Sequence, residues 1–164
     1  MTILYIPGFS VKNREETIIN ATALEIAGHA VVSVEWEHWN SPDAPWSLQN
    51  AMKTVKGLKV VPDIIVAKSI GTFVAVNLLK ELSVSKIVLL GIPVLDLSEE
   101  DLKAYSILEN IKDQTVLVHN INDNHGTLQD LSKYLELTEF DVHEIEADNH
   151  SYQYPELITA IINE

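Results

Sequence analysis

Residues 64–72 of the chain read IIVAKSIGT. The run from 64 to 66 is continuously apolar, as the buried strands of a parallel sheet are. An apolar helical pattern begins at Ile70, so only a few residues separate the two elements. The stretch therefore predicts a strand that passes through a sharp turn directly into a helix, with Ser69 at the corner.

Outward from this unit, short β-branched runs alternate with longer amphipathic segments. Strands are predicted at 3–6, 31–34, 63–67, 86–90, 115–119 and 142–145. Helical patterns lie between them, at about 13–27, 46–56, 70–82, 99–111, 127–137 and 153–163. This alternation predicts an α/β fold, a three-layer αβα sandwich around a mainly parallel six-stranded sheet with right-handed crossovers.

Local residue patterns add three expectations about the helices. Asn13 followed by Glu16 resembles a capping box at the start of the first helix, and Gly28 is placed to end that helix. The helix at 70–82 is apolar around most of its circumference. We therefore expect it to be the most buried helix.

Composition limits the classes of function. A chain of 164 residues with 46% hydrophobic content is expected to form one domain, residues 1–164. The net charge of −13 opposes binding to nucleic acid and to anionic membranes, so neither is an expected partner. Cysteine is absent, and the apolar runs are shorter than a signal peptide or a membrane span requires. We expect a soluble, cytoplasmic protein.

The residues around Ser69 resemble the nucleophile elbow of the α/β-hydrolase superfamily, usually written G-x-S-x-G. Small residues are needed two before and two after the nucleophile because the strained turn presses the backbone against its neighbours. Ala67 departs from that pattern by one methyl group, and Gly71 matches it. The resemblance implies that Ser69 is the nucleophile and that the Ile70 N–H donates to an oxyanion. The alternative is that Ser69 merely caps the helix.

A second segment, YIPGFS at 5–10, resembles the superfamily's His-Gly-x segment, with Pro7 in place of histidine. That resemblance implies that the Phe9 N–H is the other oxyanion donor. An ordinary Pro-Gly turn is the alternative interpretation.

Two later segments, VLVHNIND at 116–123 and EIEADNHS at 144–151, resemble the superfamily's acid and histidine turns, with Asn120 replacing glycine in the first. They imply Asp123 as the acid and His150 as the base, in the superfamily's order. A serine hydroxyl needs an imidazole to take its proton, and the imidazole needs a carboxylate to fix its tautomer. Asp96 is kept as the reserve acid. Asp148 is not assigned as the acid because it is too close to His150 in sequence. His119 is not assigned as the base because it is expected to cap or pack.

The interval between the fourth and fifth predicted strands has room for one turn and one helix, so no lid is expected. The resemblance covers nearly the whole chain but lacks two N-terminal strands of larger members, which makes this a minimal α/β-hydrolase fold. A substrate pocket is expected from Trp36, Trp39, Trp46, Ile92 and Pro93, unless the tryptophans serve as packing. Lys68 either meets an anionic group or is solvated.

Together these features predict a serine hydrolase that cleaves a small ester-like or thioester-like substrate through an acyl-enzyme, without metal or cofactor. Its activity should rise with pH as His150 loses its proton. A non-catalytic relative that binds a protein partner is the main alternative. A flavodoxin-like or receiver-like domain is another, although the G-x-G-x-x-G of dinucleotide-binding folds is missing after the first strand. Amidase activity and the oligomeric state stay open.

Overall fold

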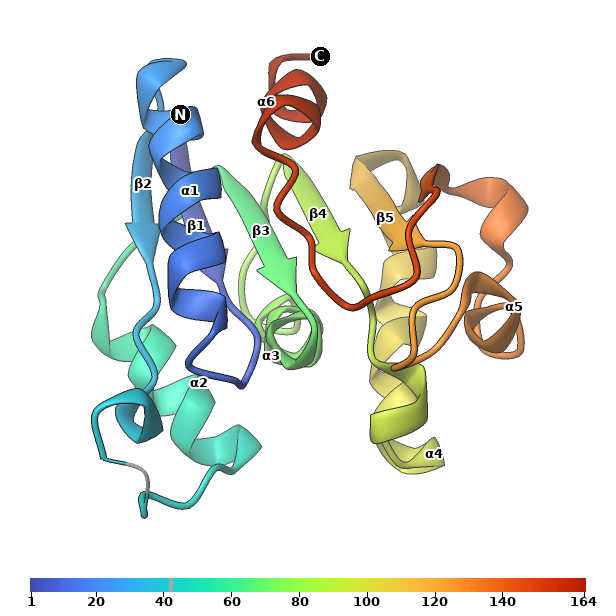
Figure 1. Ribbon diagram of the computed structural model, residues 1–164, viewed down its shortest axis with the longest axis horizontal. Helices are drawn as coiled ribbons and strands as arrows, with labels where there is room; N and C mark the ends of the chain where they lie inside the picture. The colour runs from blue at the N-terminus through green and yellow to red at the C-terminus, as the bar shows by residue number, and fades with distance from the viewer. Residues whose placement is uncertain (42) are drawn as a thin grey trace.

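The computed structural model describes residues 1–41 and 43–164 of the chain. Its centre is a six-stranded sheet in the order β2-β1-β3-β4-β5-β6, in which all neighbouring strands are parallel (Figure 1). The strands are β1 Thr2–Ile6, β2 Ala30–Ser33, β3 Ile64–Lys68, β4 Lys86–Leu90, β5 Thr115–Asn120 and β6 Asp141–Ile145. The predicted strands are confirmed to within two residues at each end.

Helices cover both faces of the sheet and complete the predicted three layers (Figure 1). The α-helices are α1 Asn13–Ile26, α2 Leu48–Gly57, α3 Ile70–Leu78, α4 Glu99–Leu102, α5 Leu128–Leu131 and α6 Pro155–Asn163. Short 3₁₀ segments are η1 Glu37–Trp39, η2 Val94–Asp96, η3 Lys103–Asn110, η4 Lys112–Gln114 and η5 Leu137–Glu139. Helices α1 and α6 share one core with the sheet, whereas α2, α3 and η3 share the other.

The central strands are apolar on both faces because both faces are covered. In β3, Ile64 and Val66 face the core under α1 and α6, and Ile65 and Ala67 face the core under α3. Helix α3 is buried at all but two of its nine positions, as expected. The edge strands β2 and β6 are only half-buried.

Three predicted helices are shorter than their sequence patterns indicated, the first being the helix predicted at 70–82, which ends at Leu78. The segment at 99–111 is α-helical only over α4 and then continues as η3, where the Ser106 hydroxyl donates to the Lys103 carbonyl (2.8 Å). In the segment at 127–137, only α5 is α-helical, and the Ser132 hydroxyl donates to the Gln129 carbonyl (2.8 Å). Such hydroxyls compete with backbone N–H groups for the carbonyls that continue a helix.

The predicted capping box at the start of α1 is wrong. Lys12 occupies the cap position with no side-chain hydrogen bond, and Asn13 and Glu16 are both buried. Their polar groups bind partners on other elements, so they are unavailable to the helix end. The predicted stop at Gly28 is confirmed by its left-handed φ of 92°.

The segment between β4 and β5 is part of the core and does not form a lid. Tyr105 and Leu108 of η3 are fully buried, and the Tyr105 and Thr72 hydroxyls are 2.6 Å apart. The segment thereby packs onto α3, and the carboxyl ends of the strands stay open. Among the residues that the structure describes, no helix has the length and apolar character needed to cross a membrane.

Candidate active site

Ser69 has a strained backbone at the junction of β3 and α3. Its φ of 54° and ψ of −127° are uncommon for a residue with a side chain. Its hydroxyl makes no capping hydrogen bond with the helix. The capping interpretation is therefore wrong, and the hydroxyl is free to bind a different partner.

Two residues after Ser69, the backbone packs closely against another segment at Gly71. A Cβ atom there would lie 2.3 Å from the Ile6 carbonyl oxygen and 2.7 Å from that of Pro7. Only glycine lets the first turn of α3 pack this tightly against the loop that follows β1. The predicted need for a small residue at this position is confirmed.

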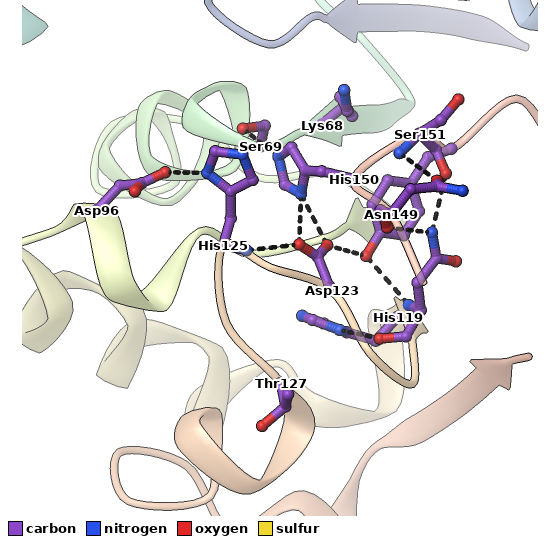
Figure 2. Close-up of polar contacts among 12 residues, drawn as sticks. Lys68, Ser69, Asp96, His119, Asp123, His125, Thr127, Asn149, His150 and Ser151 are labelled. Carbon is purple, nitrogen blue, oxygen red and sulfur yellow. Dashed lines mark hydrogen bonds and ion pairs between the residues drawn. The ribbon is translucent and has the colours of Figure 1, made fainter. Parts of the chain in front are cut away.

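Ser69, His150 and Asp123 form one hydrogen-bonded chain, named here the Ser–His–Asp array (Figure 2). The Ser69 hydroxyl donates to His150 Nε2 over 2.7 Å, and His150 Nδ1 donates to Asp123 Oδ2 over 2.7 Å. Ser69 follows β3, Asp123 follows β5 and His150 follows β6. The carboxyl ends of these strands lie at one edge of the sheet, which brings together side chains that are 81 and 27 positions apart.

Asp123 is held as a buried carboxylate. Besides His150, it accepts hydrogen bonds from the Tyr152 hydroxyl (2.6 Å) and from the His125 N–H (2.8 Å). Burial alone raises the pKa of Asp123, but the hydrogen bonds outweigh it and hold the pKa below its usual value. The carboxylate is thus ionised at neutral pH, and its interaction fixes the proton of His150 on Nδ1.

The environment of His150 favours its neutral form. Burial lowers the pKa of His150 below the ordinary 6.5, the hydrogen bond to Asp123 opposes this effect, and the positive charge of Lys68 adds to it. A neutral ring with its proton on Nδ1 has a lone pair on Nε2, directed at the Ser69 hydroxyl. This is the arrangement that a general base requires.

The reserve acid, Asp96, has a different partner. It accepts a hydrogen bond from His125 Nδ1 over 2.5 Å, and the His125 ring lies 4.1 Å from the His150 ring, centroid to centroid. Figure 2 shows Asp96 on the outer side of His125, away from His150. Asp148 and His119, which are not assigned as acid and base from the sequence, lie outside the array. Asp148 is exposed, and His119 is buried against Tyr152.

The loop after β1 is fixed through its carbonyl groups. Trp36 Nε1 donates to the carbonyls of Pro7 (3.2 Å) and Gly8 (3.1 Å), and Trp39 Nε1 donates to that of Phe9 (2.8 Å). The N–H and C=O groups of a trans peptide point in opposite directions. Holding the Gly8 carbonyl on Trp36 therefore turns the Phe9 N–H to the other side. In the part of the chain that the structure describes, neither this N–H nor that of Ile70 has an acceptor.

The Ser–His–Asp array opens into a cleft of about 820 Å³. Its apolar lining includes Phe9, Ile70, Trp46 and Pro93. The other three predicted pocket residues, Trp36, Trp39 and Ile92, are buried in the core and are absent from the lining. The two tryptophans bind the loop after β1, and Ile92 belongs to the buried core, so their expected role in the pocket is wrong.

Several polar contacts around the array were not predicted from the sequence. Lys68 is only 4% exposed, which rules out the solvated alternative, and its Nζ donates to Asn13 Oδ1 and lies 3.8 Å from Glu16 Oε2. Tyr152 and His125 contact Asp123. The contacts of Lys68 and Tyr152 join segments that are distant in the chain, so nothing in the sequence reveals them. Among the described residues, no group of three or more metal-ligating side chains could hold a metal ion.

Comparison with known proteins identifies similar chains. A family model described as an alpha/beta hydrolase domain matches residues 21–158. A search of curated proteins gave no match.

Solved structures are similar over nearly the whole chain. A protein of Xanthomonas campestris, described as an α/β serine hydrolase without a lid, is 12% identical with a TM-score of 0.66, over 99% of this chain and 78% of that one. An esterase domain from Rhodothermus marinus is 14% identical with a TM-score of 0.62, over 98% and 82%. Est1E from Butyrivibrio proteoclasticus, solved with ferulic acid bound, is 13% identical with a TM-score of 0.66, over 98% and 86%. At these identities the likeness concerns the fold.

Proposed function

Because the chain belongs to the α/β-hydrolase family, we propose that it is a serine hydrolase that cleaves small ester-like or thioester-like substrates. The family supports hydrolase activity in general. The choice of Ser69 as nucleophile and of an ester or thioester as substrate is our proposal, and it rests on the chemistry of the site.

The proposed reaction has two halves. In the first, His150 Nε2 takes the Ser69 proton while Ser69 Oγ attacks the substrate carbonyl carbon, and the imidazolium then gives that proton to the leaving alcohol or thiol. In the second, His150 takes a proton from water, the hydroxide adds to the acyl carbon, and the proton returns to Ser69. Asp123 stabilises the imidazolium in both halves and stays ionised, in keeping with its lowered pKa.

The negative charge that develops on the carbonyl oxygen needs hydrogen-bond donors. We assign this role to the N–H groups of Phe9 and Ile70, as the resemblance implies. Neither group has an acceptor among the described residues, and Ile70 is the first residue of α3, where the helix dipole is positive. Both residues also line the cleft.

One observation carries the proposal. The Ser69 hydroxyl donates to the unprotonated Nε2 of His150, and the protonated Nδ1 of the same ring donates to the buried carboxylate of Asp123. A serine that served only the fold would cap α3, and this one does not. Its left-handed backbone is a strain that the structure maintains, as strained residues at functional sites often are.

The cleft favours compact, neutral acyl groups. Trp46, Phe9 and Pro93 provide apolar surface, whereas Glu15 and Asp96 add negative charge to the rim. The description of the Rhodothermus marinus neighbour as an esterase domain is consistent with an ester as substrate for this chain as well. The absence of a lid over the described part of the chain leaves the cleft open to small substrates in solution.

Hydrolysis of p-nitrophenyl esters of graded acyl length tests the proposal. We expect the wild type to release p-nitrophenol, and Ser69→Ala to lose at least about 10⁴-fold in kcat, as when the nucleophile of a triad is removed. Ser85→Ala is the matched control, because Ser85 donates to the Asp63 carbonyl at the opposite edge of the sheet and should retain full activity. A folded wild type without activity on any ester would contradict the proposal and favour a protein-binding module.

A further inference from the structure

A buried polar cluster lies beside the Ser–His–Asp array, and no proton or bond of the proposed reaction passes through it. It consists of Asn13 and Glu16 of α1 and Lys68 at the end of β3, each no more than 8% exposed. Lys68 directly precedes Ser69 in the chain. The cluster therefore adjoins the nucleophile, although its members come from two separate elements.

The contacts of the cluster reach the two other loops of the site. Lys68 Nζ donates to Asn13 Oδ1, and the Asn13 amide donates to the Ser10 carbonyl (2.9 Å) in the loop after β1. Glu16 Oε2 accepts hydrogen bonds from the Tyr152 N–H (3.1 Å) and the Ser151 hydroxyl (3.2 Å). These last two residues directly follow His150. Helix α1 thus connects the end of β3 to the backbone that carries the base.

Stability alone gives a weak reason for such a cluster. Taking a lysine and a glutamate out of water is costly, and well-packed apolar residues of similar volume often stabilise a protein equally well or better. Lys68 Nζ and Glu16 Oε2 lie 3.8 Å apart with side chains only 5% and 10% exposed. A buried pair that directly flanks both a nucleophile and a base fits a role in the reaction better.

We propose that Lys68 and Glu16 are positioning residues for this hydrolysis, an inference that rests on the proposed function. Glu16 holds the backbone that follows His150, and Lys68 holds Glu16 against the strand that carries Ser69. The imidazole and the hydroxyl are thereby fixed relative to each other through their chain neighbours as well as through their own hydrogen bond.

Lys68 also has an electrostatic effect on the base. The groups that face His150 are Asp123, His125, Tyr152 and Ser69, with the charge of Lys68 close behind. Burial is the main cause that lowers the pKa of His150, and the charge of Lys68 lowers it further. Removing that charge should therefore raise the pKa of His150.

The groups that face Lys68 bear on whether it keeps its charge. Burial lowers the pKa of Lys68 as well, and the carboxylates of Glu16 and Asp123 oppose that effect. Asn13 contributes a neutral acceptor. Both carboxylates therefore help Lys68 to remain positive beside the base.

Two variants separate the positioning effect from the charge effect. Glu16→Ala removes the acceptor that binds the loop after His150. The double variant Lys68→Met/Glu16→Gln removes both charges but keeps the volume and a side-chain oxygen for the Tyr152 N–H. The exposed pair Lys56–Glu81, whose closest atoms are 2.7 Å apart, supplies the matched control Lys56→Met/Glu81→Gln.

We would measure kcat and KM for p-nitrophenyl acetate as functions of pH, with the rate of fluorophosphonate labelling and the circular dichroism spectrum. For Glu16→Ala, kcat and the labelling rate should fall by about 10-fold to 100-fold with a smaller change in KM, because small displacements of reacting groups are costly. In the double variant the midpoint of the pH profile should move to higher pH, with a plateau kcat closer to that of the wild type. The control should change neither quantity.

Either of two results would overturn the inference. One is a wild-type kcat and labelling rate in folded Glu16→Ala, and the other is an unchanged pH midpoint in the double variant. If Glu16→Ala fails to fold, the midpoint of the double variant decides. In each of these cases a labelled, active wild type leaves the proposed function intact. A folded wild type that neither hydrolyses the ester nor reacts with the probe would overturn both.

Discussion

At the scale of single residues, two carboxylates compete for the role of acid, and their contacts differ. Asp123 is 3% exposed and hydrogen-bonded to His150, whereas Asp96 binds His125 at the mouth of the cleft. Asp123→Asn should lower kcat by roughly 10³- to 10⁴-fold, because an amide favours the wrong tautomer of the base. Asp96→Asn should cost much less. Steady-state kinetics on a p-nitrophenyl ester would measure both, and an equal or larger loss for Asp96→Asn would show that the acid is misassigned.

The pH dependence of activity follows from the environment of His150. Burial and the charge of Lys68 lower the pKa of this imidazole below 6.5, despite the hydrogen bond to Asp123. Only the neutral ring accepts the serine proton, so kcat/KM should rise with pH through a midpoint below 6.5 and be constant near neutrality. A pH–rate profile checks this expectation. A midpoint above 6.5, or a profile flat through the acid range, would contradict the environment described for the base.

The sequence located Ser69, Asp123 and His150 because each follows a strand with a recognisable turn. The parallel sheet then brings the ends of those strands to one edge. What could not be predicted depends on contacts between distant segments. Lys68 and Glu16 are 52 positions apart in the chain, and nothing in the sequence around either residue indicates that their side chains meet. Asn13 and Glu16 fit a capping pattern equally well, so local spacing gave the wrong partner.

At the scale of elements, the close packing of α3 against the loop after β1 should be sensitive to one methyl group. Gly71→Ala would place a Cβ 2.3 Å from the Ile6 carbonyl oxygen, and neither backbone can move freely. We expect it to lower the free energy of unfolding by about 1 to 3 kcal/mol, the usual cost of overpacking, and to lower activity by displacing the loop that carries Phe9.

Gly57→Ala is the matched control for this substitution. Gly57 ends α2, and an added Cβ there meets no atom within 4 Å. Alanine should stabilise the helix by up to about 1 kcal/mol. Urea denaturation of both variants measures the difference. Equal stability of the two variants would show that the approach at Gly71 is looser than described.

Sequence periodicity predicted the existence of the helices and strands better than the residues at which the helices end. The strands were recognisable because β-branched residues recur in runs buried on both faces. The segments at 99–111 and 127–137 have the spacing of helices, but their α-helical parts end near Leu102 and Leu131. Helix α5 does begin with a capping box, in which Thr127 Oγ1 accepts from the Asp130 N–H (3.3 Å) and Asp130 accepts from the Thr127 N–H (3.1 Å). From the sequence, a capping box is predicted only for α1, where the structure has none.

At the scale of the whole molecule, the net charge of −13 should influence the choice of substrate. A negative field slows the approach of anions, and salt screens that field. Raising the ionic strength should therefore increase kcat/KM for a p-nitrophenyl ester with a free carboxylate by a few-fold relative to the uncharged ester of the same acyl length. The ratio of the two values at low and high salt is the measurement. A ratio independent of salt would show that the charge acts too far from the cleft to matter.

The order of strands and helices along the chain was enough to predict the overall fold. Alternating strands and helices predicted the parallel sheet, and the short interval between β4 and β5 predicted the missing lid. The pocket was harder to predict, because a tryptophan that lines a cleft and one that supports a loop from below look the same in sequence. Trp46 lies in the cleft lining, whereas Trp36 and Trp39 bind the carbonyls of the loop after β1.

Peptide mapping of the protein after reaction with a fluorophosphonate probe tests the central claim most directly. The account predicts a single covalent adduct, located by mass spectrometry on Ser69, lost in Ser69→Ala and formed far more slowly in His150→Ala. An adduct on another serine, or none on a folded wild type, would contradict it.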